Sequence, residues 1–395
     1  MTDRRIAICT AVLLVATCVG TTAAQDLTPM EMLGKHLFFD QNLSTPPGQS
    51  CAVCHAPEVG FTGPDSEVNA HEAIYEGAVL GRFGNRKPPS AAYGGDSPVM
   101  YFDEDEGLWI GGMFWDGRAT GWTLDDPLAE QALGPFLNPL EQNNPNARLV
   151  CFKVARSAYA PLYEAVFGQP VDFMQNVAQT YVNIGRAISA YEHSDEVNPF
   201  TSKYDYYLDG LVDLTVQEAW GLALFEDEDK GNCAACHLSQ PGLGGEPPLF
   251  TDFTYDNLGV PRNPENPFYD MPRKWNPAGY DWVDLGLGGF LAGTALYADY
   301  APENYGKHKV PTLRNVDKRP YPEFVKAYAH NGFFKSLEEI THFYNTRDIP
   351  EENWPEPEVP ENVNTDELGD LGLSLDEEAA IVAFMKTLSD GYVLP

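Results

Sequence analysis

Four stretches of the sequence show the spacing of apolar residues that is typical of amphipathic helices. Apolar residues three and four positions apart occur in 33–40, 177–191, 220–227 and 375–388, and this spacing gathers them on one face of a helix. The first and third stretches also resemble each other, since a Gly follows an apolar residue and a Leu-Phe pair comes three residues after the Gly. We interpret them as the two copies of a degenerate internal repeat.

Capping signals mark where three of the helices begin. A Ser or Thr followed three residues later by Glu can satisfy two backbone N–H groups at a helix start, and this pattern occurs at Thr215, Ser336 and Ser374. The pattern at Ser336 predicts a helix in which Ile340 and Tyr344 lie one turn apart on the same face.

Gly and Pro are frequent between these helices, above all over 239–312, where alternating apolar and polar runs are few. The stretch 350–370 is acidic and rich in Pro, which is typical of a surface loop. The pattern therefore predicts a mostly α protein with long Gly/Pro-rich loops.

Residues 1–24 have the three-part layout of a secretory signal. Arg4 and Arg5 precede an apolar run over 6–19, and small residues follow at 22–24. The run is short for a membrane-spanning helix. We therefore expect an exported protein without a stable membrane span, and we exclude 1–24 from the fold.

The charge of the chain limits its partners. The 395 residues include 25 Lys and Arg against 58 Asp and Glu, which gives a net charge of -33. A surface this negative repels phosphate backbones, so we expect no nucleic-acid partner.

The cysteines indicate a specific chemistry. The motif C-x-x-C-H occurs twice, over 51–55 and 233–237. In this motif the two thiols form thioethers with haem vinyl groups and the histidine ligates the iron. A single copy would also suit a zinc site or a redox dithiol, but two copies in an exported chain predict two covalently bound haem c groups. The predicted haem-binding residues are Cys51, Cys54, His55, Cys233, Cys236 and His237.

The chain resembles the bacterial di-haem cytochrome c peroxidase and MauG family over roughly residues 30–390. The matching segments follow the order of the family and are 33–40, 60–62, 114–119, 130–132, 134–135, 138–141, 310–315 and 330–332. The resemblance implies a periplasmic protein of two cytochrome c-like domains, at 25–200 and 201–395. It also implies a peroxidatic first haem, an electron-transfer second haem and a tryptophan between them, which Trp115 matches.

Peroxide cleavage needs an open iron face and a group that carries a proton from one oxygen to the other. Glu141 is our candidate for the proton carrier, Gln131 for positioning peroxide and Pro135 for narrowing the pocket. All three correspond to distal positions of the family, so we predict these residues and Trp115 as the catalytic set.

The second iron needs a sixth ligand of its own if it is to transfer electrons. The sequence offers Met271, His308, His330, His342 and Tyr344. In the resemblance, the position of Tyr344 carries methionine in the peroxidases and tyrosine in MauG. We therefore predict Tyr344 as an iron ligand together with His55 and His237, and we note that His71 lies where resting peroxidases supply a removable ligand to the first haem.

The residues at the calcium-binding positions depart from the pattern of the family. The calcium site of the family uses an asparagine after an arginine, but Lys87 follows Arg86, and Val325 stands at the threonine position. We expect that calcium is not bound in the usual way and that Lys87 places a fixed positive charge there. Gly231 also replaces a surface tryptophan of MauG.

The sequence thus favours a di-haem peroxidase that reduces hydrogen peroxide at the first haem with electrons delivered through the second. One alternative is a MauG-like enzyme that oxidises Tyr or Trp residues of a partner protein. A plain di-haem electron-transfer cytochrome is another. The expected partners are hydrogen peroxide and either a small basic redox protein or a protein substrate.

Overall fold

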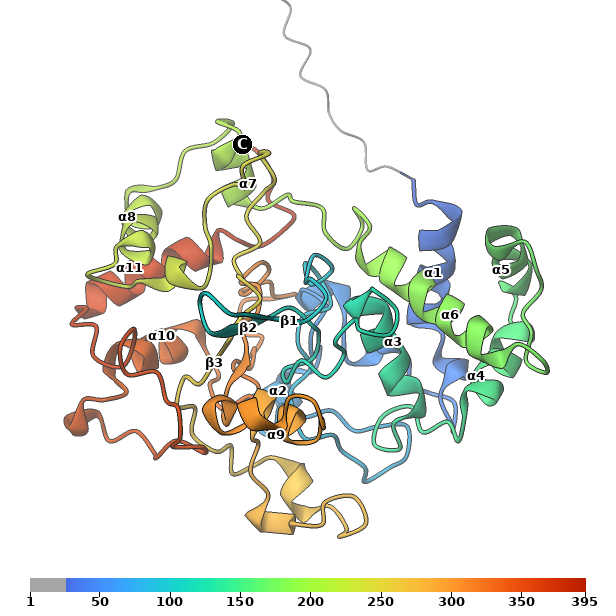
Figure 1. The fold of residues 1–395 in the computed structure, drawn as a ribbon. Helices are drawn as coiled ribbons and strands as arrows, with labels where there is room; N and C mark the ends of the chain where they lie inside the picture. Colours follow the sequence, from blue (N-terminus) through green and yellow to red (C-terminus); the bar gives the residue numbers. More distant parts are fainter. Residues whose placement is uncertain (1–25) are drawn as a thin grey trace, which may run out of the picture.

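The computed structural model describes residues 26–395, so the predicted signal over 1–24 lies outside the described residues. The described chain is rich in helices and has two short antiparallel sheets of two strands each. In Figure 1 the helices of the first half lie on one side of the molecule and those of the second half on the other, with strands and loops between them. The prediction of a mostly α protein is confirmed, because helices make up far more of the described residues than strands do.

The helices of the first half pack around one long helix, α6 (Val177–Glu192). The others are α1 (Pro29–Phe39), α3 (Pro127–Leu137), α4 (Ala147–Ala155) and α5 (Ala160–Phe167). Helices α1, α3 and α4 all contact α6. The apolar face of α6 is buried among them, as the sequence pattern predicted for 177–191.

The second half repeats the central helix pair of the first. It contains α7 (Lys203–Leu208), α8 (Val216–Glu226), α10 (Leu337–Thr346) and α11 (Leu375–Lys386). Helix α8 packs against α11 as α1 packs against α6. The capping boxes predicted at Thr215 and Ser374 are both present.

A glycine allows close contact in each of these helix pairs. A Cβ atom on Gly34 would collide with the backbone carbonyl of Ala187, and one on Gly221 would collide with that of Ala380. Only glycine permits backbones to approach this closely. The structure therefore explains why the two copies of the repeat share a Gly-containing helix.

Short elements of both halves lie where the two halves meet. They are α2 (Ser66–Ala70), α9 (Gly286–Ala292), β1 (Tyr101–Asp103), β2 (Leu108–Ile110), β3 (Tyr255–Asp256) and β4 (His308–Lys309). Strand β1 pairs with β2 in a hairpin that aligns Tyr101 with Ile110, and β3 pairs with β4. Because β2 also contacts β3, the chain segments of the two halves meet in this central region (Figure 1).

Each half has its own apolar core. The first core includes Leu33, Ile184 and the fully buried Cys151, and the second includes Phe225 and Phe384. A third, smaller core joins residues of β2, β3 and α9. Within residues 26–395, no helix is both long and apolar enough to cross a membrane.

Candidate functional site

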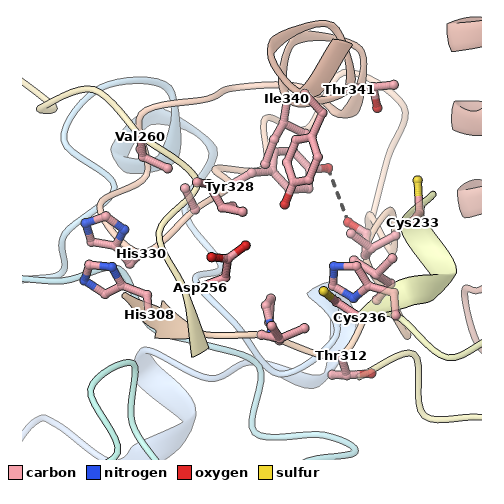
Figure 2. A pocket seen from close by; sticks show the side chains of 18 of the residues that line it. Cys233, Cys236, Asp256, Val260, His308, Thr312, Tyr328, His330, Ile340 and Thr341 are labelled. Atoms are coloured by element: carbon pink, nitrogen blue, oxygen red, sulfur yellow. Dashed lines mark hydrogen bonds between the residues drawn. The ribbon is translucent and has the colours of Figure 1, made fainter. Parts of the chain in front are cut away.

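Each C-x-x-C-H motif lines a large cavity. We name the cavity that contains the motif 51–55 the N-terminal cavity and the one that contains 233–237 the C-terminal cavity. Their empty space, including the openings to solvent, is about 1080 Å³ and 1850 Å³, respectively. Figure 2 shows the C-terminal cavity, with Cys233 and Cys236 at one end and the paired rings of His308 and His330 at the other.

The two motifs share one backbone arrangement. Each begins with a single turn of 3₁₀ helix, Cys51–Val53 or Cys233–Ala235. The N–H of His55 then donates to the carbonyl of Cys51, and that of His237 to the carbonyl of Cys233, both at 2.9 Å. This turn brings two thiols and an imidazole to the same cavity wall.

Backbone carbonyls orient both histidines of the motifs. Nδ1 of His55 lies 3.2 Å from the carbonyl of Phe61, and Nδ1 of His237 lies 2.8 Å from that of Phe250. A proton on Nδ1 that is shared with a carbonyl leaves Nε2 free as an acceptor. Burial lowers the pKa of His55 to about 4 and also lowers that of His237. Both rings are therefore neutral near pH 7, which is the form that ligates a metal.

The side chains that line the two cavities suit a haem group. The cysteines of the described residues are free rather than joined in disulfides, and burial raises the pKa of Cys54 and of Cys233 to about 12. The walls of both cavities are mainly apolar with a few polar groups, which is typical of cofactor sites. A flat apolar ligand held by two thiols and an imidazole matches this lining.

The three residues predicted for the peroxide pocket lie together in the N-terminal cavity. Gln131 and Pro135 come from α3, whose N-terminus is capped by Asp126, and Glu141 follows in the next turn. All three line the cavity together with the motif. Burial raises the pKa of Glu141, while Arg118 and the side chain of Asn138 oppose the shift.

A second carboxyl group, Glu192, lies in the same cavity and was missed by the sequence reasoning. It is the last residue of α6, is 4% exposed and lines the N-terminal cavity. Burial, with a smaller repulsion from Asp126, raises its pKa to about 8. The signal was present in the sequence, because Glu192 is four residues beyond Ile188 on the apolar face of the helix.

We expect the stability of the holoprotein to depend on pH through Glu192. Its pKa is about 8 in the folded state and 4.5 as an isolated group, so folding favours its protonated form. The contribution of Glu192 to the free energy of unfolding is fully present below about pH 4.5 and is lost as the pH rises through 8. Its size is about 1.4 kcal/mol for each unit of pKa shift. Thermal unfolding at several pH values should show the melting temperature of Glu192→Gln rising relative to that of the wild type up to about pH 8. Glu164→Gln, at an exposed position of α5, is the control, and a pH-independent difference for Glu192→Gln would refute the assignment.

Trp115 lies between the two cavities and lines both. It is 8% exposed, and its indole N–H donates to the backbone carbonyl of Lys87 at 2.9 Å. Lys309, which sequence reasoning did not single out, also lines both cavities. Its ammonium lies 3.2 Å from the carbonyl of Gly111, and burial lowers its pKa to about 7.

Tyr344 lines the C-terminal cavity together with Ile340, one turn earlier on α10. Burial raises the pKa of Tyr344 above its usual range. Met271 and His342 are not among the residues that line either cavity. His342 instead contacts Glu378 at 3.0 Å and Glu352 at 3.3 Å. The structure thus brings Tyr344 to the cavity and keeps two of the other candidates away.

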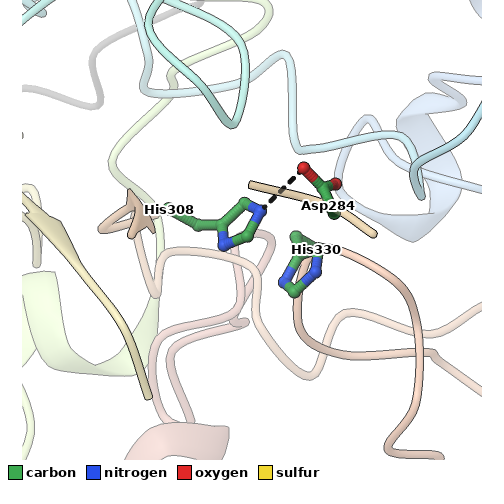
Figure 3. A group of neighbouring side chains, drawn as sticks. All are labelled: Asp284, His308 and His330. Carbon is green, nitrogen blue, oxygen red and sulfur yellow. Dashed lines mark ion pairs between the residues drawn. The ribbon is translucent and has the colours of Figure 1, made fainter. Parts of the chain in front are cut away.

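His308 and His330 form a stacked pair with Asp284 beside them (Figure 3). Their ring centroids are 3.5 Å apart and the rings are within 8° of parallel. Nε2 of neither ring has a hydrogen-bond partner among the described residues. Nε2 of His308 lies 3.5 Å from a carboxylate oxygen of Asp284. A metal ion does not suit this cluster, because Arg86 already bonds both carboxylate oxygens of Asp284 at 2.6 Å and parallel rings do not aim their lone pairs at one point.

His71 is not brought to the N-terminal cavity. It follows α2, its side chain is 54% exposed, and it lies 3.3 Å from Glu67 and 3.5 Å from Glu265. It is absent from the residues that line the cavity of the first motif. The structure thus places His71 at the surface beside acidic partners and outside the N-terminal cavity.

Comparisons with known proteins agree on one family. Residues 28–213 match the family model described as di-haem cytochrome c peroxidase. The methylamine utilization protein MauG of Paracoccus denitrificans (strain Pd 1222) is 35% identical over 371 residues, covering 91% of this chain and 88% of that protein. The cytochrome-c peroxidase IdrP2 of Denitromonas iodatirespirans is 26% identical over 366 residues, covering 91% and 81%.

The solved structures point the same way. The diheme peroxidase BthA from Burkholderia thailandensis E264 aligns with a TM-score of 0.78 at 32% identity, covering 93% of this chain and 87% of that one. A tyrosine-to-methionine variant of BthA aligns with a TM-score of 0.75 at 31% identity.

Proposed function

The chain belongs to the family of di-haem cytochrome c peroxidases and MauG proteins, and on this basis we propose that it reduces hydrogen peroxide at the N-terminal cavity with electrons that enter through the C-terminal cavity. Enzymes of this family are haem-dependent oxidoreductases. The observation that carries the proposal is the difference between the two cavities. Gln131, Pro135 and Glu141 line only the first, and Tyr344 lines only the second.

Each half of the chain, 25–200 and 201–395, is proposed to hold one haem c through the cysteines of its own motif. His55 and His237 would ligate the two irons through Nε2, which their Nδ1 contacts leave free. A bound haem supplies a redox-active iron, and the chain supplies the remaining chemistry. His308 and His330 lie at the end of the C-terminal cavity opposite the cysteines (Figure 2).

Glu141 is proposed to move the proton that peroxide cleavage requires. Reduction of one H₂O₂ to two waters consumes two electrons and two protons, and one proton must pass from the inner oxygen to the outer one. A carboxyl group whose pKa is raised toward the working pH can both accept and return a proton. The amide of Gln131 can hold the peroxide by hydrogen bonding while Pro135 limits the space around it.

Trp115 is proposed to connect the two sites. It lines both cavities, and its indole is fixed by the hydrogen bond to Lys87. A fixed aromatic ring at this position gives electrons a short path through the protein from the C-terminal to the N-terminal cavity. Because the net charge is -33, a small basic redox protein in the periplasm is the electron donor that charge complementarity favours.

Tyr344 favours a second candidate function. A phenolate is a hard anionic donor that stabilises ferric and higher iron states, whereas a thioether stabilises the ferrous state. With Tyr344 as the sixth ligand, the second site would accept electrons poorly from ordinary donors. The two electrons for peroxide would then come from Tyr or Trp residues of a partner protein, a role that similarity to MauG supports.

Covalent attachment can be tested by mass. Protein produced with a haem-attachment system and then denatured should carry two haems per chain. The double variant Cys233→Ala/Cys236→Ala should carry one and should keep the absorption bands of the first site. Cys151→Ala, in the buried core of the first half, is the control and should keep both. Denatured wild-type protein with the bare mass of the polypeptide would refute the proposal.

The two functions differ in what sustains peroxide consumption. The peroxidase predicts continuous H₂O₂ consumption when reduced cytochrome c is the only electron source. The protein-oxidising function predicts little turnover with cytochrome c and new oxidised Tyr or Trp residues on a partner. Absence of peroxide consumption with either electron source would refute both.

A further inference from the structure

The ammonium group of Lys326 is enclosed by backbone oxygens. The residue is 5% exposed, and Nζ donates to the carbonyls of Val59 at 2.9 Å, Asn315 at 2.9 Å and Lys318 at 3.1 Å. A protonated lysine has three N–H donors and no acceptor, so three carbonyls match it fully. A neutral amine would instead set its lone pair against one of them. The contacts thus stabilise the charged form.

Lys326 joins the two halves of the chain. Val59 belongs to the first half, next to the first motif, whereas Asn315 and Lys318 belong to the second. Desolvation by burial lowers the pKa of Lys326, and the positive charge of Lys87 lowers it further. Three charge-assisted hydrogen bonds oppose that effect.

Lys87 provides a second buried ammonium in the same region. Its Nζ lies 3.1 Å from the carbonyl of Pro88 and 3.2 Å from the hydroxyl of Thr62. Its backbone N–H donates to the carbonyl of His330 at 2.9 Å, and its carbonyl accepts from Trp115. Lys87 and Lys326 both line the C-terminal cavity, so the two ammonium groups lie beside the proposed electron path.

The partners of these two lysines are the kind of ligand that calcium uses. Calcium prefers six to eight oxygen ligands, including backbone carbonyls and carboxylates. The oxygens here are carbonyls and one hydroxyl, and no carboxylate contacts either ammonium among the described residues. These oxygens already serve as acceptors, and the two ammonium groups would repel a divalent cation placed among the same oxygens.

We propose that Lys87 and Lys326 take the place of the interdomain calcium that the resemblance to the family implies. The ammonium of Lys326 joins the two halves through Val59, and Lys87 joins them through its backbone N–H to His330. The holoenzyme therefore needs no divalent metal to hold the surroundings of Trp115. Removal of free calcium therefore cannot inactivate this enzyme. The inference concerns assembly and holds whichever electron source the enzyme uses.

The wild-type holoprotein gives the first test. After dialysis against EDTA, elemental analysis should find well under one calcium per chain. The melting temperature and the haem absorption spectrum should be the same in EDTA and in millimolar CaCl₂. One tightly bound calcium per chain, or a melting temperature that falls in EDTA and recovers with calcium, would overturn the proposal.

Variants give the second test. Lys326→Met keeps most of the side-chain length but leaves the carbonyls of Val59 and Lys318 without a donor, while that of Asn315 keeps the N–H of Lys318. Its melting temperature should fall by at least about 3 °C. Lys386→Met is the control, because Lys386 makes only an exposed pair with Glu338, and its melting temperature should change by less than about 1 °C. Equal melting temperatures for the two variants would contradict the proposal. If Lys326→Met does not fold, the metal analysis of the wild type still decides the question, and none of these measurements depends on peroxide turnover.

Discussion

Replacing Glu141 with Gln should slow the reaction of the holoenzyme with hydrogen peroxide by about 10²- to 10⁴-fold, which is the usual cost of losing a general acid–base group. Glutamine keeps the shape of the side chain and its place in the N-terminal cavity, but it cannot accept and return a proton. The haem content and the spectrum before peroxide is added should stay as in the wild type. Rapid-mixing absorbance with excess peroxide measures the effect.

The pH dependence of the same reaction distinguishes proton transfer from a packing effect. The rate of the wild type should fall as the pH drops through the pKa of Glu141, because the protonated carboxyl cannot accept a proton. Burial raises that pKa, so the decline should begin above the usual range of a glutamate. Glu141→Gln should lack this decline, and Glu164→Gln at the surface should behave like the wild type. A variant at position 141 that keeps the wild-type rate would remove Glu141 from the mechanism.

Replacing Tyr344 with Phe should abolish the low-spin ferric EPR signal of the second haem, because phenylalanine has no donor atom for the iron. Tyr344→Met should restore a low-spin centre with a higher reduction potential and faster turnover with reduced cytochrome c, since a thioether favours the ferrous state. EPR of the resting protein and a redox titration measure both effects.

Two features of the structure sharpen the tyrosine test. His342 contacts two carboxylates, Glu378 and Glu352, so we do not expect it to replace Tyr344 as a ligand. Tyr321→Phe is the control, because Tyr321 is an exposed residue away from both cavities. An unchanged low-spin signal in Tyr344→Phe would show that another residue ligates the iron.

The sequence predicted those features that depend on residues close together along the chain. The helix patterns at 177–191 and 375–388 and the capping boxes at Thr215 and Ser374 agree with the structure, since spacing and caps are local properties. Gln131, Pro135 and Glu141 lie on one helix and the turn after it, so their spacing along the chain already brings them together. The sequence therefore located one cavity and its polar residues correctly relative to each other, while their roles stay a prediction.

Features assembled from distant segments could not be predicted in this way. Lys326 is explained only by carbonyls of Val59, Asn315 and Lys318, which packing of the two halves brings together. The stacked pair of His308 and His330 likewise joins β4 to a loop. His71 was singled out by its place in the sequence, but its acidic partners hold it at the surface. Tertiary contacts decide the surroundings of such residues, and these contacts leave no local pattern.

The central claim is that two haem centres of one chain cooperate in the two-electron reduction of hydrogen peroxide. The direct measurement is a titration of the fully reduced holoprotein with H₂O₂ under anaerobic conditions, followed by the absorption bands of both haems. Two ferrous irons hold the two electrons that one peroxide needs, so both haems should be oxidised at an end point of one H₂O₂ per chain. Oxidation of only one haem, or a reduced protein that peroxide does not oxidise, would contradict the claim.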